Sequence, residues 1–302
     1  MKKNKILIIL LSIIFLIISY AGYYIYTNYI NKPEFIPPTG ELEFHFLTLG
    51  NGASGDCVFI KAGDNDILID GGSDTNSLDD IQNYVDARIS DNKLEYVIVT
   101  HADSDHIACF GGEVGKSSLF DLYKVDTIID FPLTEKDTQI YQRYISERTD
   151  EINVGAKHFT ALECYKESKD GAKRIYDLSA DGNIKMEILY NYYYEEDATH
   201  ENDYSVCVRF YHGSRQFLFT GDLEKSGEEK LAERYDFTQV ELFKAGHHGS
   251  STSSNDCLLR EIQPKVCVIT CAIGDKYDFP AQEFIDTISK YTSQVFVTTI
   301  CT

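Results

Sequence analysis

Two histidines and two aspartates lie within six residues of one another in the segment 100–106, Thr-His-Ala-Asp-Ser-Asp-His. His101, Asp103, Asp105 and His106 follow the apolar run 95–101, which has the composition of a buried strand. Loops at strand ends are where a rigid scaffold presents functional side chains. Imidazole nitrogens and carboxylate oxygens suit zinc and manganese, so the sequence predicts a turn that binds two divalent cations.

Two further strand ends carry residues of the same types. Asp222 closes the apolar run 215–222, and His247 and His248 close the run 240–248, just before Gly249 and Ser250. We predict that folding brings these side chains to the same cations. The sequence leaves open which of the two adjacent histidines binds a metal.

The elements that must position these groups follow a regular order. Strands are predicted at 43–50, 56–63, 66–72, 95–101 and 125–132, with a helix at about 77–90 and a polar, mostly helical stretch at 134–180. A second strand-rich half has predicted strands at 184–194, 204–213, 215–222, 240–248, 264–271 and 294–300, with helices at about 224–235 and 284–292. Two successive strand-rich halves with helices favour a mixed α/β (α+β) fold, an αββα sandwich.

The 302 residues include 28 Lys plus Arg and 48 Asp plus Glu, a formal net charge of -20. Such an anionic surface disfavours strong binding to duplex DNA. The eight cysteines include no C-x-x-C pair, and most lie in apolar strand-like segments, so they are predicted to be buried free thiols. An exported domain would allow one or two disulfides.

The N-terminus predicts a membrane anchor. Residues 1–5 carry three lysines and form the expected cytoplasmic tail, and the uncharged apolar run 6–26 is long enough to span about 30 Å as a helix. A proline-rich linker at 27–40 then leads to a domain at 41–302, expected outside the cytoplasm of a single-pass cell-membrane protein. The alternative is a cleaved signal peptide and a secreted protein, since Ser19-Tyr20-Ala21 fits a cleavage site.

The segments LIDGG (68–72), THADSDH (100–106), TGD (220–222) and GHHGS (246–250) occur in this order. Together they resemble the metallo-β-lactamase superfamily, and more narrowly the hydrolase domain of ComEC-type competence proteins and their stand-alone relatives. The resemblance covers 41–302 and implies a four-layer αβ/βα sandwich with a dinuclear metal centre between its two sheets. Asp103 stands where the superfamily usually carries a histidine, and Phe279-Pro280 where the subgroup generally carries His-Pro.

The resemblance also implies individual metal-binding roles. His101 and Asp103 would bind the first cation, Asp105 and His106 the second, and Asp222 would bridge the two. His247 or His248 would complete the second site, and the other histidine would contact the substrate.

Further residues of the resemblance surround this ligand set. Asp70, in LIDGG, would orient a ligand from behind it. Either His200 or Asn202 could complete the first site. Asn202 and Ser205 match the subgroup's Asn-x-x-Ser pattern and, with Ser250, are expected to bind the substrate.

The predicted function is that of a membrane-anchored, extracytoplasmic hydrolase that depends on two zinc or manganese ions. Its expected activity is that of a phosphodiesterase or a nuclease-like enzyme, with a small phosphoester or a nucleic-acid fragment as substrate. Two cations about 3.5–4 Å apart ionise a bridging water, which attacks the substrate. Asp105 would orient that nucleophile and one histidine of the pair would assist the leaving group.

Two alternatives remain open at this point. Tyr192 and Tyr193, followed by Glu195 and Glu196, could cage a quaternary ammonium, as in a phosphorylcholine esterase of a bacterial surface. The other alternative is a metal-binding surface module whose site is catalytically degenerate.

Overall fold

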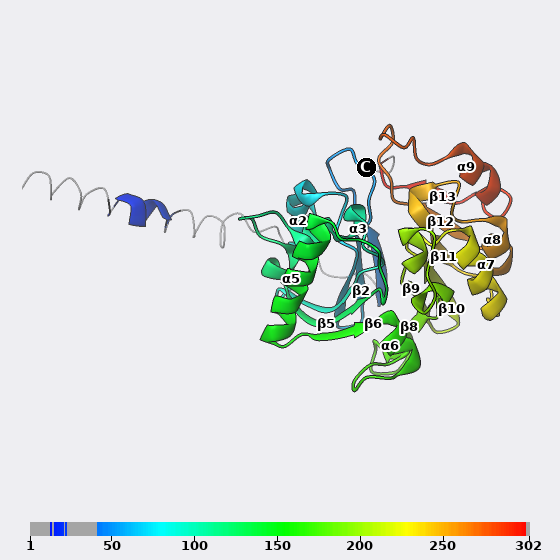
Figure 1. The fold of residues 1–302 in the computed structure, drawn as a ribbon, viewed down its shortest axis with the longest axis horizontal. Helices are drawn as coiled ribbons and strands as arrows, with labels where there is room; N and C mark the ends of the chain where they lie inside the picture. The colour runs from blue at the N-terminus through cyan, green and yellow to red at the C-terminus, as the bar shows by residue number, and fades with distance from the viewer. Residues whose placement is uncertain (1–12, 14, 21, 23–40, 300–302) are drawn as a thin grey trace, which may run out of the picture.

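The computed structural model describes residues 13, 15–20, 22 and 41–299, and two β-sheets form the centre of the domain (Figure 1). The first sheet has the strand order β1-β2-β3-β4-β5-β6, and the second has the order β13-β12-β11-β10-β9-β8-β7. The first sheet consists of β1 (Leu42–Phe46), β2 (Val58–Ala62), β3 (Asn65–Ile69), β4 (Lys93–Ile98), β5 (Lys124–Asp130) and β6 (Lys157–Thr160). The second consists of β7 (Ile175–Asp177), β8 (Ile184–Leu189), β9 (Cys207–His212), β10 (Arg215–Phe219), β11 (Leu242–Lys244), β12 (Val266–Ile269) and β13 (Val295–Val297).

Helices cover the outer face of each sheet and give four layers (Figure 1). Those of the first half are α2 (Leu78–Asp86), α3 (Ser104–Gly111), α4 (Leu119–Leu122), α5 (Gln139–Val154) and α6 (Ala161–Lys166). Those of the second half are α7 (Lys225–Arg234), α8 (Asp256–Ile262) and α9 (Gln282–Ile288). The predicted mixed α/β sandwich with two sheets is therefore confirmed.

Aromatic side chains join the two sheets face to face. Phe44 on β1 lies with its ring centroid 5.5 Å from that of Phe210 and 5.4 Å from that of Phe219, both on the second sheet. Aromatic rings at these separations bury large apolar areas and add a favourable ring–ring interaction. On the outer side of the second sheet, Leu231 of α7, Leu259 of α8 and Phe284 of α9 are buried in a second apolar cluster.

Parallel strands bring several loops to one edge of each sheet. The pairs β3–β4, β4–β5 and β5–β6 are parallel in the first sheet, as are β10–β11, β11–β12 and β12–β13 in the second. The carboxyl ends of parallel strands meet at a common edge, which is where open α/β sheets place their ligands. The loops after β3, β4, β10 and β11 carry the residues that the sequence singled out.

The segment 134–180 differs from its predicted, mostly helical structure because it contains two edge strands. In β6 and β7 only Phe159 and Tyr176 are buried, so neither strand has an apolar run that would reveal it. The predicted strand 184–194 is also too long. It ends at Leu189, and the side chain of Asn191 then accepts a hydrogen bond from the Tyr193 N–H and begins the 3₁₀ turn η3 (Tyr192–Tyr194).

The expectations for the N-terminus fall largely outside the described residues. The tail 1–5, the linker 27–40 and most of the proposed anchor 6–26 are not described. Among the residues that are described, no helix has both the length and the apolar character needed to cross a bilayer. The seven cysteines within the described ranges are free thiols, and six of them are buried.

Candidate metal centre

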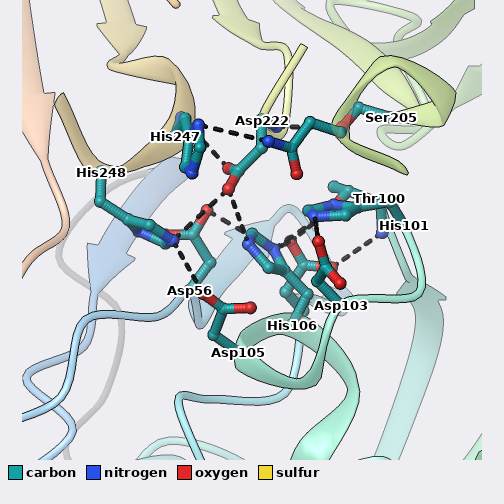
Figure 2. Close-up of polar contacts among 12 residues, drawn as sticks. Asp56, Thr100, His101, Asp103, Asp105, His106, Ser205, Asp222, His247 and His248 are labelled. Carbon is teal, nitrogen blue, oxygen red and sulfur yellow. Dashed lines mark hydrogen bonds and ion pairs between the residues drawn. The ribbon is translucent and has the colours of Figure 1, made fainter. Parts of the chain in front are cut away.

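The turn after β4 presents its ligands through the start of a helix. Asp103 occupies the N-cap position of α3 with extended backbone angles, and Asp105 and His106 lie in the first turn of that helix. The rings of His101 and His106 are fully buried, with centroids 4.1 Å apart (Figure 2). The four residues thus lie around one point instead of spreading along an exposed loop.

Asp222, in the loop after β10, completes the centre of this cluster. Its Oδ2 lies 3.2 Å from His106 Nε2 and 3.5 Å from His248 Nε2 (Figure 2). The Asp222 N–H donates to the buried Ser205 Oγ at 3.0 Å, which fixes the loop. A carboxylate placed between two histidines from different segments has the position that a bridging ligand requires.

The two adjacent histidines after β11 take different positions. His248 is buried, and its Nε2 lies 3.6 Å from Asp105 Oδ2. His247 is partly exposed, and its Nδ1 contacts Thr252 Oγ1 at 3.1 Å and Asn202 Nδ2 at 3.3 Å. The geometry therefore favours His248 as the metal ligand and places His247 beside the cluster.

Both histidines have left-handed backbone angles, with φ of 49° for His247 and 56° for His248. This conformation is unfavourable for residues other than glycine, and it persists only where surrounding contacts hold it. Asp222 supplies one such contact, because its Oδ1 accepts a hydrogen bond from the His247 N–H at 3.1 Å. The strained backbone is therefore located at the two histidines that border the cluster.

Three histidine rings are oriented by hydrogen bonds at Nδ1. His106 Nδ1 donates to Asp70 Oδ2 at 2.8 Å, and His248 Nδ1 donates to the Thr270 carbonyl at 2.9 Å. His101 Nδ1 lies 3.1 Å from Thr100 Oγ1, a hydroxyl that itself donates to Asp70 Oδ2. Each ring therefore turns its Nε2 toward the centre, which is the arrangement that metal-binding histidines need.

The Nε2 atoms of His101 and His248 are buried and have no hydrogen-bond partner within the described part of the chain. A buried polar atom without a partner costs stability unless a ligand satisfies it. Ligand atoms lie within 4.8 Å of one another in two groups of three, His101–His106–Asp222 and Asp105–His106–His248. The donor set and its free lone pairs fit divalent cations.

Asp103 lies farther out than these two groups. Its Oδ2 is 3.7 Å from His101 Nε2, and its Oδ1 pairs with the ammonium group of Lys136. The carboxylate thus turns one oxygen toward the histidines and the other away from them.

A buried ion pair lies behind the cluster, and the sequence prediction did not include it. Lys244 Nζ is 2.5 Å from Asp56 Oδ2, and both side chains are at most 3% exposed. Asp56 lies two residues before β2, and its Oδ1 lies 3.3 Å from His248 Nδ1. The available signals were the Asp that follows the glycine-rich turn 50–55 and the single lysine in an apolar strand before the histidine pair.

These charges shift the titration of the cluster. Burial and the neighbouring His106 charge lower the pKa of His101 to about 4, so this ring is neutral at pH 7. Burial also lowers the pKa of His248, but the charges of Asp222 and Asp56 outweigh it and raise the value to about 10. The carboxylates therefore attract positive charge to this place, either protons or a metal ion.

A cavity of about 620 Å³ opens directly beside the cluster. Asp103, Asp105, Asn202 and His247 line it on the metal side. Tyr277 and Phe279 also line it; their rings stack with centroids 5.4 Å apart, and the Phe279 ring lies 5.6 Å from that of His247. Asn202 Nδ2 donates to Glu224 Oε1 at 2.9 Å, which holds the amide against His247.

Two of the expected substrate-binding serines have other positions. Ser205 is fully buried and acts on Asp222 through its hydroxyl, and the buried Ser250 contacts Thr252 within the turn. Neither lines the cavity. His200, the other candidate for the first metal site, is exposed and belongs to neither ligand group.

Tyr192 and Tyr193 do not line the cavity either, so the structure does not bring the two tyrosines expected to cage a quaternary ammonium to the metal centre. They belong to a tyrosine patch, which consists of Tyr165, Tyr190, Tyr192 and Tyr193. The cation that contacts this patch is a side chain of the protein itself. The Arg234 guanidinium lies 4.1 Å from the ring centroid of Tyr190 and 5.4 Å from that of Tyr165. Tyr192 lines a separate hollow of about 240 Å³ with Tyr190 and Arg234.

Comparison with known proteins supports the reading of the centre. A family profile described as "Metallo-beta-lactamase superfamily" matches residues 50–117 and 195–271, which include the turn 100–106, Asp222 and both histidines after β11. This is a protein of the metallo-β-lactamase fold. That superfamily typically binds divalent metals, in agreement with the two ligand groups described above.

The relatives of this metallo-β-lactamase-fold protein include competence proteins, consistent with the ComEC-type subgroup. ComE operon protein 3 of Bacillus subtilis (strain 168) is 25% identical over 206 residues, which are 68% of this chain and 24% of that protein. Competence protein ComA of Neisseria gonorrhoeae is 34% identical over 85 residues, 27% of this chain and 12% of that protein. The matched regions thus span a quarter or less of these relatives.

Among solved structures, the metallo-beta-lactamase fold protein YhfI from Bacillus subtilis aligns with a TM-score of 0.49 and 16% identity, covering 85% of this chain and 94% of YhfI.

Proposed function

We propose that this protein is a hydrolase of phosphoric diesters that uses two divalent metal ions, zinc or manganese. The observation that supports the proposal most directly is the pair of buried Nε2 atoms of His101 and His248, which have no hydrogen-bond partner in the described structure and lie close to carboxylates beside an open cavity. His248 Nε2 is near Asp222 and Asp105, and His101 Nε2 is near Asp103. His101 and Asp222, with Asp103 nearby, would hold one ion, and Asp105, Asp222 and His248 would hold the other; His106, whose Nδ1 is used by Asp70, would bind one of the two through Nε2. Bound there, the ions would supply Lewis acidity and lower the pKa of a water molecule.

The protein's own residues account for orientation and proton transfer. The Asp105 carboxylate lines the cavity and is 30% exposed, so it can accept a hydrogen bond from an attacking water. Contact with His248 and the charge of His106 outweigh burial and lower the pKa of Asp105 to about 2, which keeps it ionised. Asp105 is therefore the proposed acceptor at neutral pH.

His247 is the proposed donor to the leaving group. Because Asn202 Nδ2 must donate to Glu224, its remaining N–H is directed to His247 Nδ1, which then accepts. The proton of the neutral ring is consequently on Nε2. A ring N–H at the cavity wall can stabilise charge on a departing oxygen.

The test is hydrolysis of bis-p-nitrophenyl phosphate by the full chain with added Mn²⁺ or Zn²⁺. Wild type should turn over this diester, and Asp105→Asn should lose activity by at least about 100-fold, the usual size of a proton-transfer contribution. Asp64→Asn, a change in the exposed turn between β2 and β3, is the matched control and should retain full activity. Equal rates in wild type and Asp105→Asn would contradict the proposal.

We also propose that the domain lies outside the cytoplasm, tethered by the apolar run 6–26. The support is the sequence alone, namely the three lysines that precede the run and its length. Protease added to intact cells should then remove the domain, and a domain that is cut only after lysis would contradict this location.

A further inference from the structure

Lys136 is a lysine that the predicted mechanism does not use, although it borders the metal centre. It lies between β5 and α5, lines the cavity and is 32% exposed. Its ammonium group pairs with Asp103 Oδ1. A strongly acidic chain thus places a cation beside the carboxylates of the metal centre.

The loop that carries Lys136 is fixed to the metal-binding turn by Glu201. Glu201 Oε1 accepts from Thr134 Oγ1 at 2.6 Å and from the Ala102 N–H at 3.3 Å, and Oε2 accepts from the Glu135 N–H at 3.2 Å. The Lys136 N–H in turn donates to Thr134 Oγ1 at 2.9 Å. One carboxylate therefore ties both segments together, so the position of Lys136 relative to the turn is preset.

The two oxygens of Asp103 separate Lys136 from the metal ligands. Oδ2 is the oxygen near His101 Nε2, at 3.7 Å, whereas Oδ1 pairs with the lysine. A cation bound among the histidines and the Lys136 ammonium can therefore contact the same carboxylate from opposite sides. Lys136 would then lie next to the metal ions on the side that faces the cavity.

The other lysine of the cavity differs from Lys136. Lys276 is exposed, and its ammonium lies 4.6 Å from the ring centroid of its neighbour Tyr277. Lys136, held by Asp103 and by the Glu201 contacts, loses less conformational freedom when it binds a ligand. It is thus the better placed of the two for an anionic group that reaches the metal ions.

We propose that Lys136 is a substrate-binding residue that contacts a phosphate oxygen of the ester while other oxygens of the same group face the metal ions. This inference rests on the proposed function, because it assumes that the cluster binds metal and that the cavity admits a phosphoester. It adds a specificity determinant, since a neutral substrate gains nothing from this ammonium group. Ammonium groups bind phosphate oxygens through charge-assisted hydrogen bonds.

The test measures binding of inorganic phosphate to the full chain loaded with Mn²⁺, by isothermal titration calorimetry. Lys136→Gln should bind phosphate roughly tenfold more weakly than wild type, and Lys136→Arg should recover most of the affinity. Lys116→Gln, which removes an exposed lysine paired with Glu113, is the control and should match wild type. The Mn²⁺ content of each protein is measured alongside.

Unchanged phosphate affinity in Lys136→Gln would overturn the inference. Loss of Mn²⁺ from that variant would also overturn it, because Lys136 would then serve to orient Asp103. No hydrolysis is needed for this experiment. A wild-type protein that binds metal and phosphate but does not cleave the diester would contradict the proposed function and leave the role of Lys136 standing.

Discussion

The metal centre and the tyrosine patch are two clusters of residues that could each do chemistry, and only one has unused bonding capacity. In the metal centre, His101 Nε2 and His248 Nε2 are buried without a hydrogen-bond partner in the described structure. In the tyrosine patch, Arg234 covers the ring of Tyr190 at 4.1 Å and donates to Tyr165 Oη at 2.8 Å. The patch supplies its own cation, whereas no side chain of the described structure satisfies these two ring nitrogens in the metal centre.

The difference teaches that residue type alone does not identify a site. Both clusters have the composition of a cation-binding site, carboxylates with imidazoles in one and aromatic faces with carboxylates in the other. What separates them is whether internal partners satisfy the polar groups. Unsatisfied buried polar atoms are rare in folded proteins, so the two histidine nitrogens need an explanation, and a bound metal ion supplies one.

The largest effect is expected when the two adjacent histidines are substituted one at a time. His248→Ala removes a buried nitrogen of the centre, so we expect the amount of bound Mn²⁺ per chain to fall. Diester hydrolysis should drop more than about 100-fold, which is a larger loss than that caused by removing a residue that only orients a metal ligand. His247→Ala should keep its metal and lose roughly 100-fold in kcat. Metal analysis and steady-state kinetics on both variants check this.

If His247→Ala lost the metal and His248→Ala retained it, the assignment would be reversed. Full activity in both variants would show that this cluster is not the site of hydrolysis.

A change of pH is expected to have a smaller effect, which is on the affinity for metal, because protons and metal ions compete for the same cluster. The pKa of His248 is raised from 6.5 to about 10, so below pH 10 a cation must displace a proton from this ring. Metal affinity should therefore rise between pH 6.5 and 10, by about tenfold per pH unit for each proton displaced. Calorimetric titrations with Mn²⁺ at pH 6.5, 7.5 and 8.5 measure this slope.

The same pKa shift gives the opposite trend for stability without metal. The raised pKa means that protonated His248 stabilises the fold fully below pH 6.5, and that this contribution is lost as pH rises toward 10. Denaturant unfolding in a chelator should show it. A metal affinity that stays constant from pH 6.5 to 8.5 would contradict proton competition at the centre.

The smallest effect is expected in the tyrosine patch. Arg234→Ala removes the guanidinium from the rings of Tyr190 and Tyr165, so the free energy of unfolding should fall by about 0.5–1 kcal/mol. Metal content and diester turnover should not change. Urea unfolding checks the first statement, and binding of choline to the wild-type protein would show that the patch is a ligand site after all.

The parts of the centre that the sequence predicts well are those whose signal is local. The turn 100–106 places four potential ligands, two histidines and two aspartates, within six residues after an apolar strand, so spacing alone indicates a cluster. Lys244 gives no such signal, since it is one polar residue in a strand, and its partner Asp56 lies far away in the chain. A contact between distant segments depends on how the sheets pack, which neither segment encodes by itself.

The direction in which a side chain points is equally hard to predict. Ser205 belongs to a motif near the ligands, yet it faces inward and holds the Asp222 backbone. The tyrosine run 190–194 has strand-like composition, but Asn191 stops the strand by capping a short turn. Strands β6 and β7 were missed because edge strands need few buried residues.

The ion pair between Asp56 and Lys244 joins the beginning of one sheet to the middle of the other. Neither half of the chain can therefore assemble this centre during synthesis while the other half is still missing. Uptake of metal would then be a late event in folding. The time at which bound metal is first detected after dilution from denaturant would measure when the two halves dock. If the chain were cut between Asp56 and Lys244, each fragment would carry one charge of the pair. A buried charge without its partner is destabilising.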